Sequence, residues 1–138
     1  MSKLETPMTR AYWQRMGGTL LEEYPIIKRT KSCGARYLDA IILPKGEFRI
    51  AKWKEISLEG KDIIIVQSKA NRLGMSLMGQ ALFSIELVKP YRPASIRSIA
   101  LCLKDDEVLR SFLKPFPNIE VVILSRDEIC SSDKLIHA

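Results

Sequence analysis

The stretch that decides the fold is Ile63-Ile64-Ile65-Val66-Gln67-Ser68-Lys69-Ala70. Its four consecutive β-branched residues predict a buried strand over 62–70. Because side chains alternate along a strand, Gln67 and Lys69 should point to one face and Ser68 to the other. An amide and an ammonium on one buried face are costly without partners. The pattern therefore indicates either a functional site or a strand that emerges into water.

The length and composition fit one globular domain. The chain has 138 residues, of which 46% are hydrophobic and 28% are charged. We expect a single domain over 1–138, with a core at about 8–124 and a polar tail at 125–138. The sequence contains no run of about 18 apolar residues, so we expect no transmembrane helix. The first residues lack the apolar core of a signal peptide, so we expect no membrane association and a cytoplasmic location.

Cysteine and histidine usage excludes several kinds of site. The three cysteines, Cys33, Cys102 and Cys130, are odd in number and form no CxxC pair. This spacing favours neither a disulfide framework nor a structural zinc site. The single histidine, His137, lies in the tail. Catalysis by Ser-His-Asp or Cys-His arrangements is therefore not expected.

The charge is unevenly distributed along the chain. The net charge is +6, and residues 1–104 carry 18 Lys and Arg against 9 Asp and Glu, whereas residues 105–138 carry 4 against 7. The positive part contains the Gln67 and Lys69 strand. Positive charge around a cleft attracts phosphate groups. Two interpretations stay open, a nucleic-acid partner and an ordinary basic surface.

Periodicity and turn residues predict the other elements. Helices are expected at 7–16, 75–89 and 105–113. Strands are expected at 35–43, 47–58, 62–70, 96–103 and 119–124. The pair Gly17-Gly18 should end or bend the first helix. Residues 19–27 fit a helical turn and a strand equally well, and the segments 28–34 and 71–74 are expected to be loops.

A carboxylate interrupts the predicted strand at 35–43. Asp39 should share a face with Tyr37, Ile41 and Leu43, and an acidic residue within a buried strand is rarely there for packing. Short turns between successive strands predict an antiparallel meander. Such a meander would bring Asp39 close to the Gln67-Ser68-Lys69 segment on one face.

In the structural interpretation, the Asp39 carboxylate forms an ion pair with Arg36 or Lys69 at the end of the strand. The functional interpretation is different. A carboxylate, a second oxygen ligand and a lysine suit a hard divalent cation such as Mg²⁺. Such an ion can activate a water and offset the charge on a phosphate. A lysine can orient the water or stabilise developing negative charge.

These residues resemble the PD-(D/E)XK nuclease superfamily, which has the restriction-endonuclease-like fold. Asp39 matches the strand aspartate of that family. Gln67-Ser68-Lys69 matches the E-x-K element in the variant that has glutamine first. The resemblance implies an α/β fold with an αβββαβ core over roughly 8–103 and a mixed central sheet flanked by helices. Gln67 in place of glutamate removes one negative charge, and Leu38 stands where the family has proline.

The resemblance also implies an activity, the Mg²⁺-dependent hydrolysis of DNA phosphodiester bonds by an endonuclease, with Mn²⁺ as a substitute ion. Asp39, the Gln67 oxygen and the Ser68 backbone carbonyl would hold the metal. Glu22 or Glu23 would complete the metal site, and Lys69 would assist the attacking water. Further contacts to nucleic acid are expected from residues near the site: Lys31, Arg36, Arg72 and Gln80.

One further family element is only half matched. Some members carry Q-x-x-x-Y in the helix after E-x-K, and here Gln80 is followed by Ser84 at the tyrosine position. With no separate domain to read sequence, specificity would come from DNA structure, from a partner protein or from a homodimer. Two alternatives remain. One is an inactive nucleic-acid-binding or assembly module of the same fold, and the other is an interaction protein with no role on nucleic acid.

Overall fold

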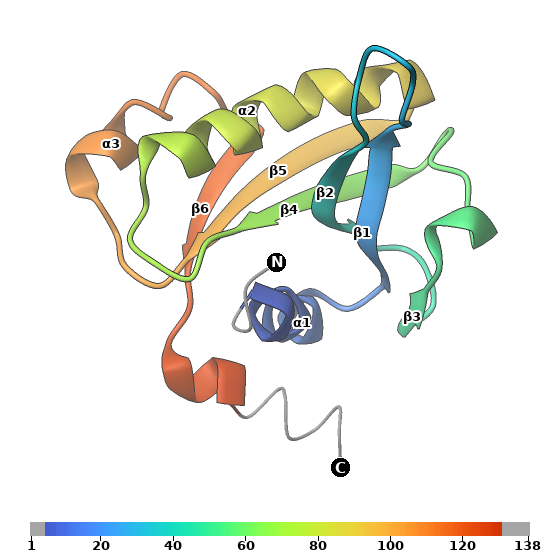
Figure 1. Cartoon of the computed structure of the whole chain (residues 1–138). Helices are drawn as coiled ribbons and strands as arrows, with labels where there is room; N and C mark the ends of the chain where they lie inside the picture. Colours follow the sequence, from blue (N-terminus) through green and yellow to red (C-terminus); the bar gives the residue numbers. More distant parts are fainter. Residues whose placement is uncertain (1–4, 131–138) are drawn as a thin grey trace.

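A central six-stranded sheet organises the computed structural model, which describes residues 5–130. The strand order is β3-β1-β2-β4-β5-β6. Helix α1 covers one face of this sheet and helix α2 covers the other (Figure 1). The mixed α/β class and the sheet flanked by helices are as the sequence predicts.

The element order alternates helices and strands along the chain. The bounds are α1 (Glu5–Met16), β1 (Thr19–Ile27), β2 (Arg36–Leu43), β3 (Arg49–Ala51), β4 (Asp62–Ser68), α2 (Met75–Val88), β5 (Ser95–Cys102), α3 (Glu107–Ser111) and β6 (Ile119–Ile123). Two short 3₁₀ helices lie at Trp53–Glu55 and Lys89–Tyr91. None of the helices within residues 5–130 is long and apolar enough to cross a membrane.

The sheet combines antiparallel and parallel pairs. Strand β2 is antiparallel to both β1 and β4, and it pairs Ala40 with Val66. Strands β4, β5 and β6 run parallel, because α2 and α3 return the chain to the same edge before each new strand. The short strand β3 lies at the far edge, parallel to β1. The first turn of the meander therefore places β2 between β1 and β4.

Most predicted elements are confirmed within a few residues, including the strand at 62–70 and the helix at 75–89. The ambiguous segment 19–27 is strand β1. The expected strand at 47–58 was wrong over most of its length, because only 49–51 pairs with a neighbour and a 3₁₀ turn follows. The meander next to Asp39 therefore uses β1 as its third strand and does not use the segment 47–58.

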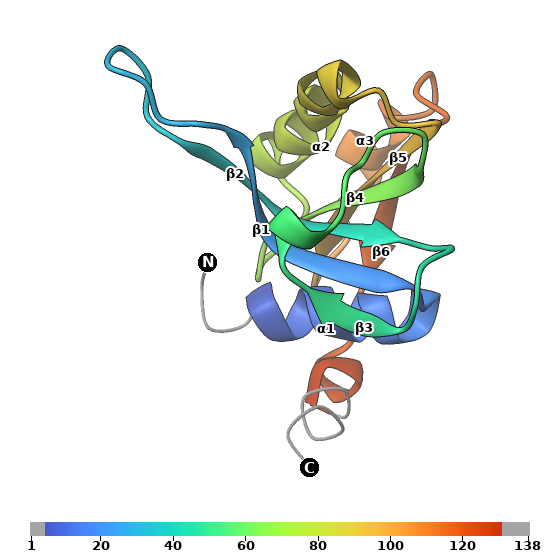
Figure 2. The ribbon, with the colours of Figure 1, turned by 90° about the vertical axis from the view of Figure 1, so that its right-hand side faces the viewer.

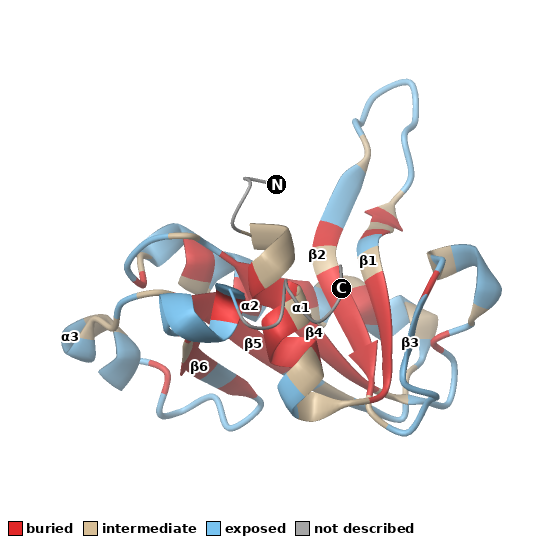
Figure 3. Cartoon of the chain, turned by 90° about the horizontal axis from the view of Figure 1, so that it is seen from below, coloured by how far each residue is buried: buried red, intermediate tan, exposed pale blue. Residues whose placement is uncertain are grey.

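Two apolar layers hold the helices on the sheet. Met8, Tyr12 and Trp13 of α1 pack on one face, and Leu77, Ala81 and Val88 of α2 pack on the other. Figure 3 shows the buried residues concentrated in the sheet and on the inner sides of these helices. The core extends past the expected limit at 124, because residues 126–130 are helical and Ile129 is buried against the α1 layer. Residues 131–138, with His137, lie outside the described residues.

Glycines join α1 to β1, as the sequence predicts. The helix ends at Met16, and Gly17 and Gly18 adopt φ of +75° and +80°. The Trp13 indole Nε1–H donates a hydrogen bond to the Gly18 carbonyl oxygen at 2.7 Å. A Cβ on Gly18 would collide with the Leu43 carbonyl oxygen and lie 2.8 Å from the Pro44 Cα, whereas one on Gly17 would meet nothing within 4 Å. This junction fixes α1 against the end of β2.

Candidate functional site

Asp39 is held at the end of β4 by Ser68. Its Oδ2 accepts hydrogen bonds from the Ser68 backbone N–H at 2.8 Å and from the Ser68 hydroxyl at 3.2 Å. Within residues 5–130 its carboxylate forms no ion pair, so the alternative partners Arg36 and Lys69 do not neutralise it. The Asp39 carboxylate is therefore held by two uncharged donors, the backbone N–H and the hydroxyl of Ser68.

Burial raises the pKa of the Asp39 carboxyl above its ordinary value of 3.8, and the two Ser68 hydrogen bonds oppose that rise. Only Oδ2 has hydrogen-bond partners among the described residues. Among these residues, no fully buried side-chain oxygen lacks a partner. The Asp39 Oδ1, which has no such partner, is therefore not fully buried.

Gln67 bridges Asp39 to helix α2. Its Oε1 accepts the Asp39 backbone N–H at 3.2 Å, and its Nε2 donates to the Ser84 hydroxyl oxygen at 2.9 Å. The Ser84 hydroxyl in turn donates to the Gln80 carbonyl oxygen at 2.5 Å. Gln67 is only 6% exposed, and a buried polar side chain needs hydrogen-bond partners. The Gln67 amide has one partner for its oxygen and one for its nitrogen. Both ends of the Gln67 amide are therefore used within the protein.

The alternation expected along β2 is interrupted near Asp39. Leu38, Ile41 and Leu43 pack together in the layer that includes Val88 of α2, although strict alternation would put Leu38 opposite Ile41. Alternation therefore breaks within 38–41. Asp39 lies within this break, and its carboxylate contacts Ser68.

The break lies across from an unusual backbone conformation at Glu23. Strand β1 pairs Glu22 with Ala40 and Tyr24 with Leu38, so Glu23 stands opposite Asp39 in the register. Glu23 has φ of +48°, a left-handed conformation that costs a non-glycine residue about 1 kcal/mol. Strain of this kind, observed beside a buried carboxylate, favours a functional position.

The two glutamates that the resemblance leaves open behave differently. Glu22 receives two hydrogen bonds from Arg10 of α1, at 3.1 and 3.0 Å, and both side chains are largely covered. Its carboxylate is therefore engaged in fixing α1 to β1. Glu23 is exposed, and its backbone stands opposite Asp39 in the register of β1 and β2. Of the two, only Glu22 forms an ion pair among the described residues.

The expected cationic and polar residues do not all gather at Asp39. Lys69 is exposed at the end of β4, and its backbone N–H donates to the Leu101 carbonyl oxygen. Arg72 is exposed and forms a backbone bridge with Lys104. Lys31 lies in the loop between β1 and β2. Arg36 and Gln80 lie closer, because both line the pocket described next.

A pocket of about 330 Å³ opens between the end of β2 and helix α2. Its polar lining is formed by Arg36, Tyr37, Asp39, Gln67, Gln80 and Ser84. The pocket therefore joins the hydrogen-bonded set around Asp39 to solvent. This is the place where a small ion or a phosphate can approach the Asp39 carboxylate.

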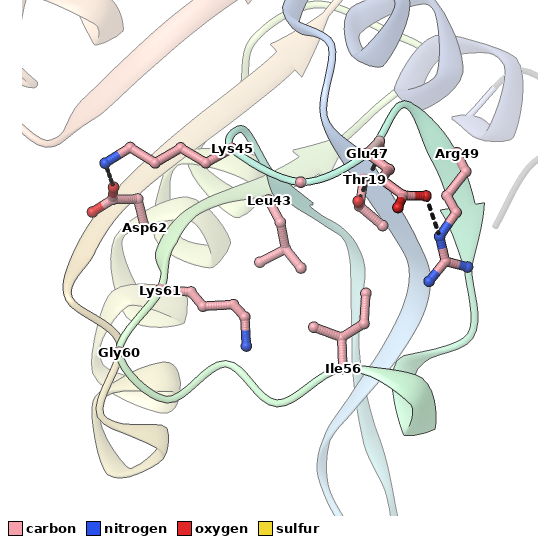
Figure 4. Close-up of a pocket in the computed structure, with 10 residues that line it drawn as sticks. Thr19, Leu43, Lys45, Glu47, Arg49, Ile56, Gly60, Lys61 and Asp62 are labelled. Carbon is pink, nitrogen blue, oxygen red and sulfur yellow. Dashed lines mark hydrogen bonds and ion pairs between the residues drawn. The ribbon is translucent and has the colours of Figure 1, made fainter.

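A second pocket, of about 380 Å³, lies at the opposite end of β2 beside Leu43 (Figure 4). Four residues along a strand separate Asp39 from this end, a distance of about 13 Å. Its charged residues already have partners: Lys45 contacts Asp62 at 2.6 Å, and the Lys61 ammonium donates to the Ser57 carbonyl oxygen at 2.7 Å. These two lysines of the second pocket, unlike Lys28, Arg29 and Lys31, therefore have partners among the described residues.

The side-chain oxygens around Asp39 are of the kind that binds Mg²⁺ in proteins. Mg²⁺ keeps several waters and is commonly bound through one or two carboxylates. The Asp39 carboxylate and the Gln67 Oε1, which accepts the Asp39 backbone N–H, are the two oxygen groups of this kind. Within residues 5–130, no group of three or more His, Cys, Asp or Glu side chains is arranged to hold a metal. A metal ion at Asp39 would therefore have fewer negatively charged ligands than a metal ion held by a cluster of carboxylates.

Two contacts of this site were missed in the sequence. Ser84 is buried, although it stands beside the apolar stripe of α2, and its hydroxyl is the partner of Gln67. A serine four residues after Gln80 on a buried stripe was the available signal. No sequence pattern indicates the ion pair between Arg10 and Glu22, because the two residues lie on different elements.

Comparison of the chain with protein-family models, with curated proteins and with solved structures finds no match.

Proposed function

We propose that this protein is a metal-dependent nuclease that hydrolyses DNA phosphodiester bonds. The observation that carries the proposal is the hydrogen-bonded link between Asp39 on β2 and Gln67-Ser68 at the end of β4, with Lys69 exposed directly after them. The order of α1, the antiparallel β1-β2-β4 meander, α2 and the parallel β5 supports the same proposal, because it agrees with the restriction-endonuclease-like core that the motif implies.

Each residue of the site has a separate task in this proposal. The Asp39 Oδ1, the Gln67 Oε1 and the Ser68 backbone carbonyl are the metal ligands, and Ser68 also keeps the Asp39 carboxylate oriented. Glu23 is the candidate for an additional ligand through water. When bound, Mg²⁺ supplies Lewis-acid activation of a water and neutralises phosphate charge. The Lys69 ammonium positions the water or stabilises charge on the phosphate.

A specific observation favours one second candidate, an inactive DNA-binding or assembly module of the same fold. Asp39 is the only carboxylate among the described residues that contacts Gln67 or Ser68. A site with one such carboxylate binds Mg²⁺ more weakly than a site with two or three. The metal requirement of the protein separates the two candidates.

Lys69→Ala tests the chemistry of the proposal. We expect cleavage of single-stranded and plasmid DNA in Mg²⁺ to fall at least about 100-fold, because a positioned cation is lost from the site. The melting temperature should change little, because the Lys69 side chain is exposed. Turnover is measured with a fluorescent oligonucleotide, and Mn²⁺ binding is measured by calorimetry.

The matched control is Lys114→Ala, which removes an exposed lysine of equal charge from the segment between α3 and β6. Its cleavage rate should equal that of the wild-type protein. Equal residual cleavage in wild type and Lys69→Ala would mean that a contaminant cuts the DNA, and the catalytic assignment would be wrong. Wild-type binding of DNA without any cleavage would favour the inactive module.

Gln67→Glu tests the metal side of the proposal. Without metal, the new carboxylate can no longer donate to the Ser84 hydroxyl and lies beside the Asp39 carboxylate in a buried site. We expect the free energy of unfolding in EDTA to fall by about 1–3 kcal/mol. With Mn²⁺ the variant should gain more stability than wild type, because a second charge holds the ion. Chemical denaturation with and without Mn²⁺ measures both effects.

Gln80→Glu is the control for this change, since Gln80 lines the same pocket but is exposed. It should change the stability in EDTA by less than about 0.5 kcal/mol. A Gln67→Glu protein whose stability does not respond to Mn²⁺ would argue against metal binding at Asp39.

A further inference from the structure

The loop between β1 and β2 projects from the body of the protein as an arm (Figure 2). We define the arm as residues 28–36. Its cations Lys28, Arg29, Lys31 and Arg36 are all exposed. The whole segment 24–38 contains no acidic residue. A concentration of positive charge on a projecting loop attracts a polyanion.

Most of the arm's charges have no ion-pair partner among residues 5–130. Within residues 5–130, Lys28, Arg29 and Lys31 form no ion pair, in contrast with Lys45 in the pocket of Figure 4. Arg36 donates through Nη1 to the Gly34 and Ala35 carbonyl oxygens, at 3.1 and 3.2 Å, and so shapes the base of the arm. The three remaining cations of the arm are available to phosphates.

A groove of about 780 Å³ at the base of the arm combines these cations with aromatic side chains. It is lined by Lys28, Arg29, Arg36, Tyr37, Trp53 and Lys54. Cations that follow a phosphate backbone, together with rings on which bases stack, are the combination that binds single-stranded nucleic acid. A duplex has its bases already paired and stacked, so it offers no free base to such a ring.

Tyr37 is the ring that is free to stack. It is 61% exposed and has no aromatic partner among the described residues. The Trp53 ring is already used, because Tyr24 packs edge-on against it at 6.1 Å and the Lys54 ammonium lies 5.5 Å from its centre. Phe112 is as exposed as Tyr37 but lies on the acidic part of the chain. Exposure alone therefore does not distinguish Tyr37, whereas its cationic surroundings do.

The groove is continuous with the candidate site. Arg36 and Tyr37 line both the groove and the pocket that contains Asp39 and Gln67. Asp39 follows Tyr37 by two residues on the same strand, about 7 Å along β2. A nucleotide stacked on Tyr37 would therefore have a neighbouring phosphate within reach of the Asp39 carboxylate.

We propose that the arm and Tyr37 bind unpaired nucleotides of a DNA strand, with a base stacked on Tyr37 and the phosphates on Lys28, Arg29 and Lys31. The choice of DNA rests on the proposed function. The proposal assigns the substrate class as single-stranded DNA or the unpaired strand of a branched DNA. A fully paired duplex binds more weakly, because only the phosphates are recognised.

Fluorescence anisotropy in EDTA tests this proposal with three 12-nucleotide probes, namely oligo(dT), an abasic strand of equal charge and a duplex. Wild type should bind oligo(dT) at least about tenfold more tightly than the other two, since stacking acts only on an unpaired base. Tyr37→Ala should lose about tenfold on oligo(dT) and nothing on the abasic strand. Tyr37→Phe should bind like wild type, and so should the control Phe112→Ala.

The cations of the arm are tested by salt dependence. The triple variant Lys28→Ser, Arg29→Ser, Lys31→Ser should lower the slope of log affinity against log salt by about two, because each phosphate contact on a single strand contributes about 0.7. A control triple variant with the same change in charge should keep the wild-type slope: Lys104→Ser, Lys114→Ser and Arg126→Ser. Equal slopes for the two triple variants would overturn the assignment of the arm.

The binding experiment is independent of cleavage, so the two proposals fail separately. Oligo(dT) binding that depends on Tyr37, without Mg²⁺-dependent cleavage, would leave the arm in place and contradict the nuclease activity. Cleavage by a Tyr37→Ala protein that binds all three probes like wild type would contradict the role of the arm alone. Equal wild-type affinity for the oligo(dT), abasic and duplex probes would also overturn the proposal.

Discussion

Asp39→Asn is expected to reduce Mg²⁺-dependent DNA cleavage at least about 100-fold while leaving the fold intact. The asparagine oxygen can still accept both hydrogen bonds from Ser68, so the end of β4 keeps its geometry. What is lost is the negative charge that a divalent cation needs. Cleavage rates, Mn²⁺ titration and circular dichroism of the same protein preparation separate the loss of function from unfolding.

The same variant should be at least as stable as wild type at neutral pH. Because burial raises the Asp39 pKa, the folded chain holds this proton more tightly than the unfolded chain does. Ionised Asp39 therefore opposes folding, and its unfavourable contribution grows as the pH rises from the unfolded value of 3.8 through the folded pKa. The stability difference between Asp39→Asn and wild type should increase over this pH range and then level off.

Denaturation in EDTA across pH 3 to 8 measures this difference. The lowered pKa values of Asp62 and Glu55 change the stability of both proteins in the same way, so they cancel in the difference. A variant that is less stable than wild type at pH 7, with full cleavage activity, would assign Asp39 a purely structural role.

Gly18→Ala is expected to have the largest effect on stability. Gly18 has φ of +80°, a conformation that costs an alanine about 1–2 kcal/mol. The added methyl group also meets the backbone at Leu43 and Pro44, which cannot move without displacing the end of β2. Overpacking adds about 1–3 kcal/mol. A total loss of about 2–5 kcal/mol is a large part of the stability of a domain this size.

Gly17→Ala is the matched control, because Gly17 has nearly the same φ and open space around its Cα. It should lose only the conformational part, about 1–2 kcal/mol. Urea denaturation of both variants gives the two losses. Equal losses of stability in the two variants would mean that the clash with the end of β2 contributes nothing. The loss would then come from the positive φ alone.

The long regular elements could be predicted from the sequence for clear physical reasons. The β-branched run at 62–70 and the apolar stripe at 75–89 each match one period over many residues. Segment 19–27 matched no single period, because the left-handed residue Glu23 interrupts its alternation. Segment 47–58 alternated loosely, yet only the three residues 49–51 find a pairing partner.

The sequence predicts which residues form the candidate site better than it predicts how they are arranged. Asp39 and Gln67 were singled out because polar groups in apolar strands need partners, and the structure brings them within hydrogen-bonding distance. Alternation alone could not anticipate that Leu38 packs in the same layer as Ile41 and Leu43. The partnership of Gln67 with Ser84 depends on how α2 crosses β4, which is a tertiary feature.

The exposed position of Lys69 is the point on which the catalytic account rests most heavily. Its side chain makes no ion pair with the described residues, and its backbone is anchored to β5 through Leu101. In the proposed nuclease, this lysine, fixed at its backbone and free at its ammonium, acts on a phosphate bound near Asp39. This arrangement suits a cation that acts only when substrate and metal are present.

The most direct test of the nuclease proposal is the cleavage of a circular single-stranded DNA and a supercoiled plasmid by purified wild type, Asp39→Asn and Lys69→Ala, each in Mg²⁺ and in EDTA. We expect wild type to cleave both DNAs in Mg²⁺ but not in EDTA, and to cleave the single-stranded circle faster. Both variants should cleave at least about 100-fold more slowly. Cleavage that persists in EDTA, or that is equal in all three proteins, would contradict the nuclease proposal.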